Sequence, residues 1–225
     1  MSYLDQYAYG LWGRVLVNIV FLVGFTYYIF KPQAKREWRS MGAYAAFAVA
    51  LFTEMYGFPL TIYFLTSVLG NNYPVLDPFT HVNGHLWVVL AGGSKVLFSI
   101  IHPLSNLIIM LGLLVIHMGW KGIHSGKGEL VTTGIYKYIR HPQYTGFMLI
   151  ITGFLIQWPT IITLIMAPIL FIIYIRLAKK EEELMIKTFD EEYIKFKEEV
   201  PAFIPNRRIR LKDFFKRKSQ QSIEE

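Results

Sequence analysis

Two groups of polar residues in the second half of the chain carry side chains that could do chemistry. The first contains Arg140, His141 and Tyr144, and the second begins about 40 residues later with Glu181 and Glu182. A guanidinium, an imidazole, a phenol and two carboxylates can hold a small charged molecule through charge-assisted hydrogen bonds. The residue types therefore predict a polar binding site, provided that the fold brings the two groups together.

The segment between the two groups decides whether they meet. Residues Tyr144 to Ile175 include no charged side chain over 32 positions, and one helix of that length would be about 48 Å long. That is too long for a single crossing of a hydrocarbon core about 30 Å thick. Proline disfavours a helix through the residue before it, so Trp158-Pro159 predicts a turn between two helices, with Trp158 in the aromatic belt of the far interface. A tight hairpin returns the chain to its starting side and predicts contact between the two groups.

Three further apolar segments before the hairpin predict membrane helices, which makes about five in total. They cover Leu11–Phe30, Met41–Leu69 with a kink at Pro59, and approximately Leu97–Trp120. Residues 71–93 are polar and rich in turn-forming residues, which predicts an extramembrane loop with one short interfacial helix. Only 17% of all residues are charged, whereas soluble domains have about 25%. The sequence therefore predicts an all-α integral membrane protein.

The distribution of basic residues predicts the orientation of these helices. The net charge of +7 is concentrated in the loop Lys31–Arg39, in residues 121–140 and in the tail from Lys179 onward. Basic residues favour the cytoplasmic side of a membrane. With five spans, this rule places the amino end outside and the carboxy end and the polar site in the cytoplasm. The same distribution argues against a nucleic-acid partner, and the absence of cysteine excludes disulfides and Cys-ligated metals.

Beyond the hairpin, the chain is expected to continue as a cytoplasmic amphipathic helix. Apolar residues recur every three or four positions from Met185 to Val200. Asp190, followed by Glu191 and Glu192, is typical of a helix start. We predict one membrane domain for the whole chain. Residues 1–97 would hold the first spans and the outer loop, 98–205 the core with both polar groups, and 206–225 a flexible charged tail.

The order of residues in the first polar group adds specificity. Residues 131–136 read Val-Thr-Thr-Gly-Ile-Tyr and residues 140–146 read Arg-His-Pro-x-Tyr-x-Gly, and the paired acids follow. Together with the uncharged hairpin, this pattern resembles the isoprenylcysteine carboxyl methyltransferases and the related bacterial phospholipid methyltransferase-like proteins, over residues 130–205. Sterol-reductase-type proteins share part of the motif, but an acid typically follows their last glycine. Phe147 stands there in this chain, which favours methyl transfer over reduction with NADPH.

The resemblance implies that S-adenosylmethionine binds in a cytoplasm-facing pocket and that a lipophilic acceptor enters sideways from the bilayer. It implies catalytic roles for Arg140 and Glu182, with Arg140 near the reacting end. Arg140 would either hold an anionic acceptor or, like His141, pair with the carboxylate of the cofactor. The residues that match the family's cofactor-binding stretch are Gly134, Tyr136, His141, Pro142, Tyr144, Glu181 and Glu182.

Other interpretations of the same residues remain. Arg140 and His141 could anchor the chain at the interface while the acids lie on a solvated helix. An NADPH-dependent membrane reductase and a non-enzymatic transporter or scaffold are the rival functions. The acceptor of a methyltransferase could be a prenylcysteine carboxylate, a phospholipid amine, a lipophilic thiol or a quinone-like hydroxyl.

Ionisable residues outside the two groups suggest other sites. Glu54 lies within a span, where an acid is costly and therefore indicates function. We expect it to contact substrate, or else to bond to neighbouring hydroxyls such as those of Thr53 and Tyr56. No metal is expected, because His81 and His85 have the spacing of a metal pair but no evident third ligand. Haem would need facing histidines, and only the third span contains any, at positions 102 and 117.

Overall fold

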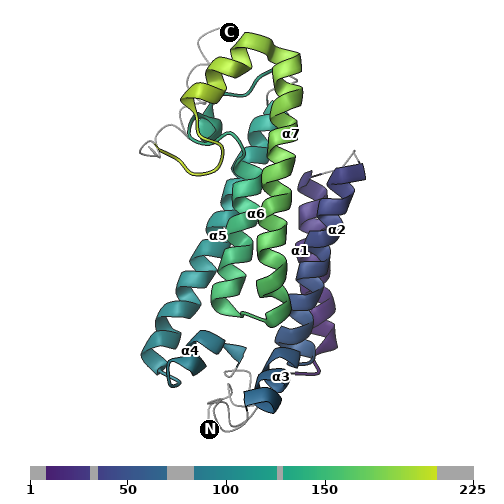
Figure 1. The fold of residues 1–225 in the computed structure, drawn as a ribbon, viewed down its shortest axis with the longest axis vertical. Coiled ribbons are helices and arrows are strands. Elements are labelled where there is room, and N and C mark those ends of the chain that lie inside the picture. Colours follow the sequence, from purple (N-terminus) through teal and green to yellow (C-terminus); the bar gives the residue numbers. More distant parts are fainter. Residues whose placement is uncertain (1–8, 31–34, 70–83, 126–128, 207–225) are drawn as a thin grey trace, which may run out of the picture. The chain divides into compact units, whose positions relative to one another are not determined.

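The computed structural model describes residues 9–30, 35–69, 84–125 and 129–206, and these form helices joined by turns, with no strand among them. The chain divides into two compact units. Unit 1 comprises Met1–Met110 and Leu149–Tyr174, and unit 2 comprises Leu111–Met148 and Ile175–Glu225. The all-helical fold is therefore confirmed for the described residues. The helices are α1 Trp12–Phe30, α2 Lys35–Phe52, α3 Leu60–Leu69, α4 Leu86–Leu90, α5 Lys95–Ser125, α6 Pro142–Gln157 and α7 Ile161–Glu199 (Figure 1).

Among the described helices, α5 and α7 are long and apolar enough to cross a membrane. Helices α2 and α3 reach that length only as a bent pair, and the apolar stretch Trp12–Tyr28 of α1 is shorter. Helix α6 has 16 residues. The expected number of five spans therefore stays a prediction, and so does the single membrane domain.

The second predicted span is bent, as the proline at position 59 indicated. A π-helix, Thr53–Gly57, follows α2 directly, and α3 begins at Leu60 after a bend of 71°. Proline has no backbone N–H and cannot continue a helix without losing a hydrogen bond. The kink at Pro59 is confirmed, whereas the π-helix before it was not foreseen.

The turn predicted at Trp158-Pro159 is confirmed in unit 1, where α6 ends at Gln157 and α7 begins at Ile161. Thr160 and Thr163 cap α7 reciprocally, because each backbone N–H donates to the hydroxyl of the other residue at 3.1 Å. The expected place of Trp158 in an aromatic belt is wrong. Its side chain is only 2% exposed and packs on Gly84, where a Cβ would lie 1.9 Å from the indole ring.

In unit 2, small residues let α6 approach α5 closely and so position the first polar group. A Cβ on Gly146 would lie 2.6 Å from the backbone oxygen of Gly112, and one on Gly119 would lie 2.8 Å from the ring of Pro142. Close backbone approach through glycine is a common way of packing membrane helices. Pro142, the first residue of α6, is therefore fixed against α5, and His141 is fixed beside it.

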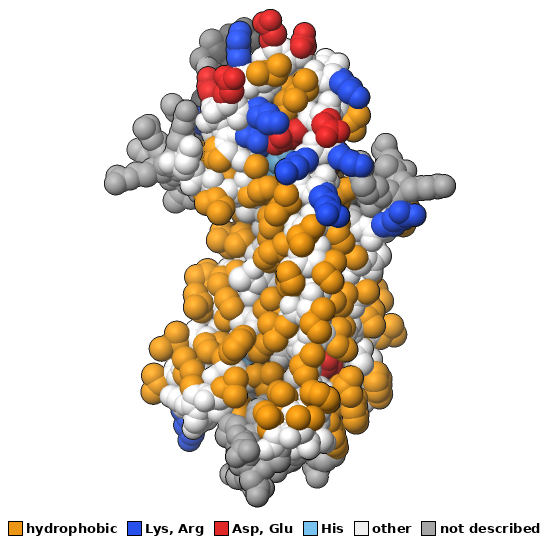
Figure 2. Space-filling model, viewed as in Figure 1, with side chains coloured by type: hydrophobic (Ala, Val, Ile, Leu, Met, Phe, Trp, Pro, Cys, Tyr) orange, Lys and Arg blue, Asp and Glu red, His pale blue; other side chains and the backbone are white. Residues whose placement is uncertain are grey.

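The two units differ in the side chains that they expose. Large exposed apolar side chains in unit 1 include Leu16, Val20, Phe64 and Ile165. Figure 2 shows charged side chains gathered over unit 2, whereas the visible face of the unit 1 helices is mainly hydrophobic. This distribution is the one expected of an integral membrane protein with a polar end.

Candidate functional site

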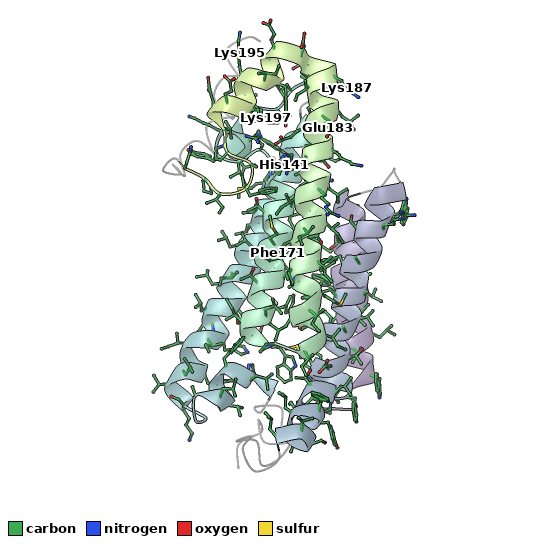
Figure 3. All side chains as sticks on the ribbon, viewed as in Figure 1. His141, Phe171, Glu183, Lys187, Lys195 and Lys197 are labelled. Carbon is green, nitrogen blue, oxygen red and sulfur yellow. The ribbon has the colours of Figure 1, made fainter. Side chains whose placement is uncertain are left out.

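An ion-paired cluster centred on Glu182 joins the two polar groups in unit 2. Arg140 donates to Glu182 Oε1 from Nη2 at 2.6 Å and from Nε at 3.0 Å. His141 Nε2 lies 3.0 Å from the same oxygen, and Lys197 Nζ lies 2.8 Å from Oε2. The expected contact of the first group with the acids is confirmed. Lys197 was missed, because it follows on a later turn and no motif marks it. Figure 3 shows His141 and Lys197 close together.

The charges of this cluster shift the pKa values of its members. Burial alone would raise the pKa of Glu182, but bonds from His141, Lys197 and Arg140 outweigh burial and hold that pKa well below its ordinary range. Burial alone would lower the pKa of His141, but the hydrogen bonds and negative charges of Glu181 and Glu182 outweigh it and raise the pKa. The cluster therefore favours a carboxylate at Glu182 and an imidazolium at His141.

The two adjacent acids have different surroundings. The Glu182 side chain is 8% exposed, whereas that of Glu181 is 43% exposed. Glu181 accepts a hydrogen bond from the Tyr144 hydroxyl, and one of its oxygens lies 3.6 Å from His141 Nδ1. Glu182 thus neutralises the buried cations of Arg140 and His141, while Glu181 retains access to a ligand. The sequence could not distinguish these roles.

Backbone hydrogen bonds tie the polar group to a segment near residue 200. Arg140 Nη1 donates to the carbonyl oxygens of Lys197, at 2.9 Å, and of Val200. The backbone N–H of Arg140 donates to Pro201 O at 2.9 Å, and that of His141 to Ala202 O at 3.0 Å. These carbonyl contacts carry no sequence signal beyond the resemblance, since any residue type supplies the same oxygen. Arg140 therefore joins α7 to the segment that follows it.

A cavity of about 400 Å³ lies beside this cluster, entirely within unit 2. Typical small-molecule sites measure about 300–1,000 Å³, so a nucleoside-sized ligand can be held. One part of its wall is polar and the larger part is aliphatic and aromatic. The lining residues are Ile123, Glu129, Leu130, Val131, Tyr136, Arg140, His141, Glu181, Leu184, Met185, Thr188, Phe189, Tyr193 and Phe196.

Of four further predicted cofactor-binding residues, Tyr136 lines the cavity, whereas Gly134, Pro142 and Tyr144 do not. Tyr136 donates to Gly119 O at 3.2 Å, and burial together with the charge of Glu181 raises the pKa of its phenol. Gly134 has a φ of +65°, a conformation that glycine adopts readily. Pro142 and Tyr144 support the cavity, Pro142 through α5 and Tyr144 through Glu181.

The donor set of the cavity fits S-adenosylmethionine chemically. Glu181 and Glu129 can accept hydrogen bonds from an ammonium or from ribose hydroxyls, and an imidazolium at His141 can pair with a carboxylate. Phe189 and Phe196 supply flat apolar surface for a purine ring. Glu129 was not foreseen, because it precedes the motif.

Glu54 lies in unit 1 and is not among the residues that line this cavity. Its Oε2 accepts the backbone N–H of Thr61 at 2.8 Å, in the first turn of α3, and the Thr160 side chain lies beside the carboxyl group. Thr61 Oγ1 in turn accepts the N–H of Ile161 at the start of α7. The sequence suggested Thr53 and Tyr56 as partners of the Glu54 carboxyl group. In the structure its partners are Thr61 and Thr160, at the starts of α3 and α7. The expected substrate role of Glu54 stays a prediction.

Two histidines outside the cluster, His85 and His102, occupy structural positions in unit 1. His85 Nδ1 lies 2.8 Å from Gln157 O, and His102 Nε2 lies 3.3 Å from Gln157 Nε2. Both contacts hold the α6–α7 turn. His81 lies outside the described residues, so the metal pair considered for it and His85 is not described.

The pH dependence of stability should reveal the ion pairs of His141 with Glu181 and Glu182. The pKa of His141 is raised above 6.5, so its stabilising contribution is complete below pH 6.5 and is lost as the pH rises through the raised value. The pKa of Glu182 is lowered below 4.5, so its contribution is present above pH 4.5 and is lost only in stronger acid. We expect the melting temperature in detergent to fall on the alkaline side of pH 6.5, and to fall less steeply in His141→Gln. Parallel plots of melting temperature against pH for the two proteins would contradict a stabilising role of these His141 ion pairs.

The segment that holds the cluster is similar in sequence to known proteins. Residues 87–192 match the phospholipid methyltransferase family model, a stretch that includes Arg140, His141 and Glu182. Over 77 residues the chain is 32% identical to the protein-S-isoprenylcysteine O-methyltransferase of Schizosaccharomyces pombe. That alignment covers 34% of this chain and 33% of the relative, so the chain matches about a third of the relative's length. These two matches confirm the resemblance of the chain to the isoprenylcysteine carboxyl and phospholipid methyltransferases.

Proposed function

We propose that this protein is an integral membrane methyltransferase that transfers a methyl group from S-adenosylmethionine to a lipophilic acceptor. The observation that carries the proposal is the cavity of about 400 Å³ where Glu181 and His141 meet an apolar wall. This cavity lies largely within the segment that matches the methyltransferase family. The gathering of charged side chains over unit 2 supports a site outside the hydrocarbon core (Figure 2). By the positive-inside rule, we place the site in the cytoplasm and the amino end outside.

The residues of the cavity would bind and orient the cofactor. S-adenosylmethionine supplies, when bound, a methyl group on a positively charged sulfur, and in-line transfer chiefly requires alignment with the acceptor. Glu181 would accept a hydrogen bond from the cofactor's ammonium group, and His141 would pair with its carboxylate. Glu182 would keep the three cations beside it in place. The predicted role of Arg140 at the reacting end competes with its bonds to Glu182 and the backbone.

The acceptor is proposed to be a lipophile that reaches the site from the bilayer. The name of the fission-yeast relative refers to an isoprenylcysteine O-methyl product, which makes a prenylcysteine carboxylate the first acceptor to test. A phospholipid amine, the substrate class suggested by the name of the matching family, is the second. Glu54, on the bent second segment, is the proposed contact along the acceptor's route.

Cofactor binding tests the proposal directly. We expect the purified protein in detergent to bind S-adenosylmethionine or its demethylated product at roughly micromolar Kd, about −8 kcal/mol, and to show no specific heat with NADPH. Calorimetry with both cofactors makes the comparison. Heat with NADPH alone would replace the proposal by a membrane reductase. Incubation with radiolabelled cofactor and lipid extracts would then identify the acceptor.

A further inference from the structure

The chain changes direction at Asp190 by adopting a conformation that is unusual for its residue type. Asp190 has φ 44° and ψ −122°, and it is the only non-glycine residue with positive φ in the described ranges. Residues on both sides are helical, so the break is confined to one position of α7. Backbone strain of this kind persists only where surrounding contacts hold it. Asp190 is thus a single-residue break between two helical stretches of α7, and we refer to this position as the hinge.

The segment beyond this hinge forms one wall of the cavity. Tyr193 and Phe196 line the cavity from residues 191–203, and both are buried. The opposite wall on α7, before the hinge, includes Glu181 and Phe189. Burial and the charge of Glu182 raise the pKa of the Tyr193 phenol to about 12, so it stays neutral at physiological pH. Moving residues 191–203 would therefore open the cavity.

Residues 191–203 are held at their far end by a small set of polar bonds. Lys197 Nζ pairs with Glu182 Oε2 at 2.8 Å, and Arg140 Nη1 binds the carbonyls of Lys197 and Val200. The last described bond is from Thr145 Oγ1 to Phe203 O at 3.1 Å. These partners lie just before α6, in its first turn, or on α7 before the hinge. The segment therefore begins at the break at Asp190 and is held beyond it by these hydrogen bonds and the ion pair.

We propose that residues 191–203 are a lid over the cavity, which opens about Asp190 to admit a cofactor and closes when Arg140 and Glu182 bind its far end. The proposal rests on the proposed function for the identity of the ligand, an adenosyl sulfonium or its demethylated product. The closed lid buries the ligand and excludes water from the site of methyl transfer. Arg140 acts in this scheme as a positioning residue, since it holds the wall that the cofactor contacts.

Spin labels can follow the lid in the full-length protein, because the chain has no cysteine to remove. Cysteines replacing Glu183, before the hinge, and Lys195, on the lid, would carry the labels (Figure 3). Both side chains are exposed and neither lines the cavity. Distances would be measured with and without S-adenosylhomocysteine, in the parent protein and in hinge variants.

The hinge variants have opposite expected effects. Asp190→Gly relieves the strain of positive φ, so we expect the ratio of closed to open populations to rise roughly 5- to 150-fold without ligand. Asp190→Ala favours an uninterrupted helix, so the open population should rise and S-adenosylhomocysteine should dissociate faster. Glu192→Ala, two residues further on and exposed, is the matched control and should leave the distances unchanged.

The outcomes separate the lid from the proposed function. Distances that respond to Asp190→Gly and Asp190→Ala without ligand support the lid, even if no adenosyl ligand binds. Ligand binding with one unchanged distance in all variants would overturn the lid and leave the function standing. A change of equal size in Glu192→Ala would also overturn it, because the hinge would then not be specific to position 190.

Discussion

Replacing Glu182 with glutamine is expected to destabilise unit 2 by about 3–5 kcal/mol, the usual cost of removing one partner from a buried ion pair. Glu182 is the shared anion for Arg140, His141 and Lys197, and an amide cannot neutralise them. Thermal melting in detergent would measure the loss, and calorimetry would show weakened binding of S-adenosylhomocysteine. Glu183→Gln, at the exposed neighbouring position, should melt like the parent protein.

A different result for Glu182→Gln would support the cofactor-binding role that the family resemblance implied for Glu182. If Glu182→Gln melts normally but loses cofactor affinity, its carboxylate must contact the cofactor directly. We propose Glu181 for that contact instead, because its side chain is 43% exposed and lines the cavity. The melting temperature thus distinguishes a residue that supports the site from one that binds the ligand.

Arg140→Lys is expected to weaken cofactor binding at least 10-fold and to lower the melting temperature. The guanidinium spans Glu182 Oε1 and the carbonyls of Lys197 and Val200, and a single ammonium cannot reach all of them. Each lost charge-assisted bond costs about 1.5–3 kcal/mol. Calorimetry and the same spin-label pair would show both effects. Normal affinity with lost turnover would instead place Arg140 at the acceptor.

The elements that the sequence predicted well are those with local or periodic signals. The uncharged run interrupted at Trp158-Pro159 indicated two helices, and the return of the chain explained why Arg140 meets Glu182. Hydrocarbon length and the chemistry of proline are enough for both conclusions. The kink at Pro59 followed from the same chemistry.

The features that escaped sequence reasoning depend on tertiary contacts. Lys197 resembles any other lysine of a solvated helix until the break at Asp190 brings it to Glu182. The partners of Glu54 on α3 and at the α6–α7 turn are 7 and about 106 residues away in sequence, beyond any helical neighbour rule. Trp158 was expected in the interfacial aromatic belt, because its burial depends on contact with Gly84 in a distant segment.

The bonds between residues 140–145 and residues 197–203 also determine when the site can form during synthesis. Thr145 and Phe203 are 58 positions apart, and the chain emerges from the ribosome amino end first. Helices α5 and α6 are thus complete while Arg140 still lacks its carbonyl partners. A nascent chain that stalls before Phe203 would hold an unfinished cluster. A fusion placed after residue 206 should preserve the site, whereas a truncation before residue 203 should abolish it.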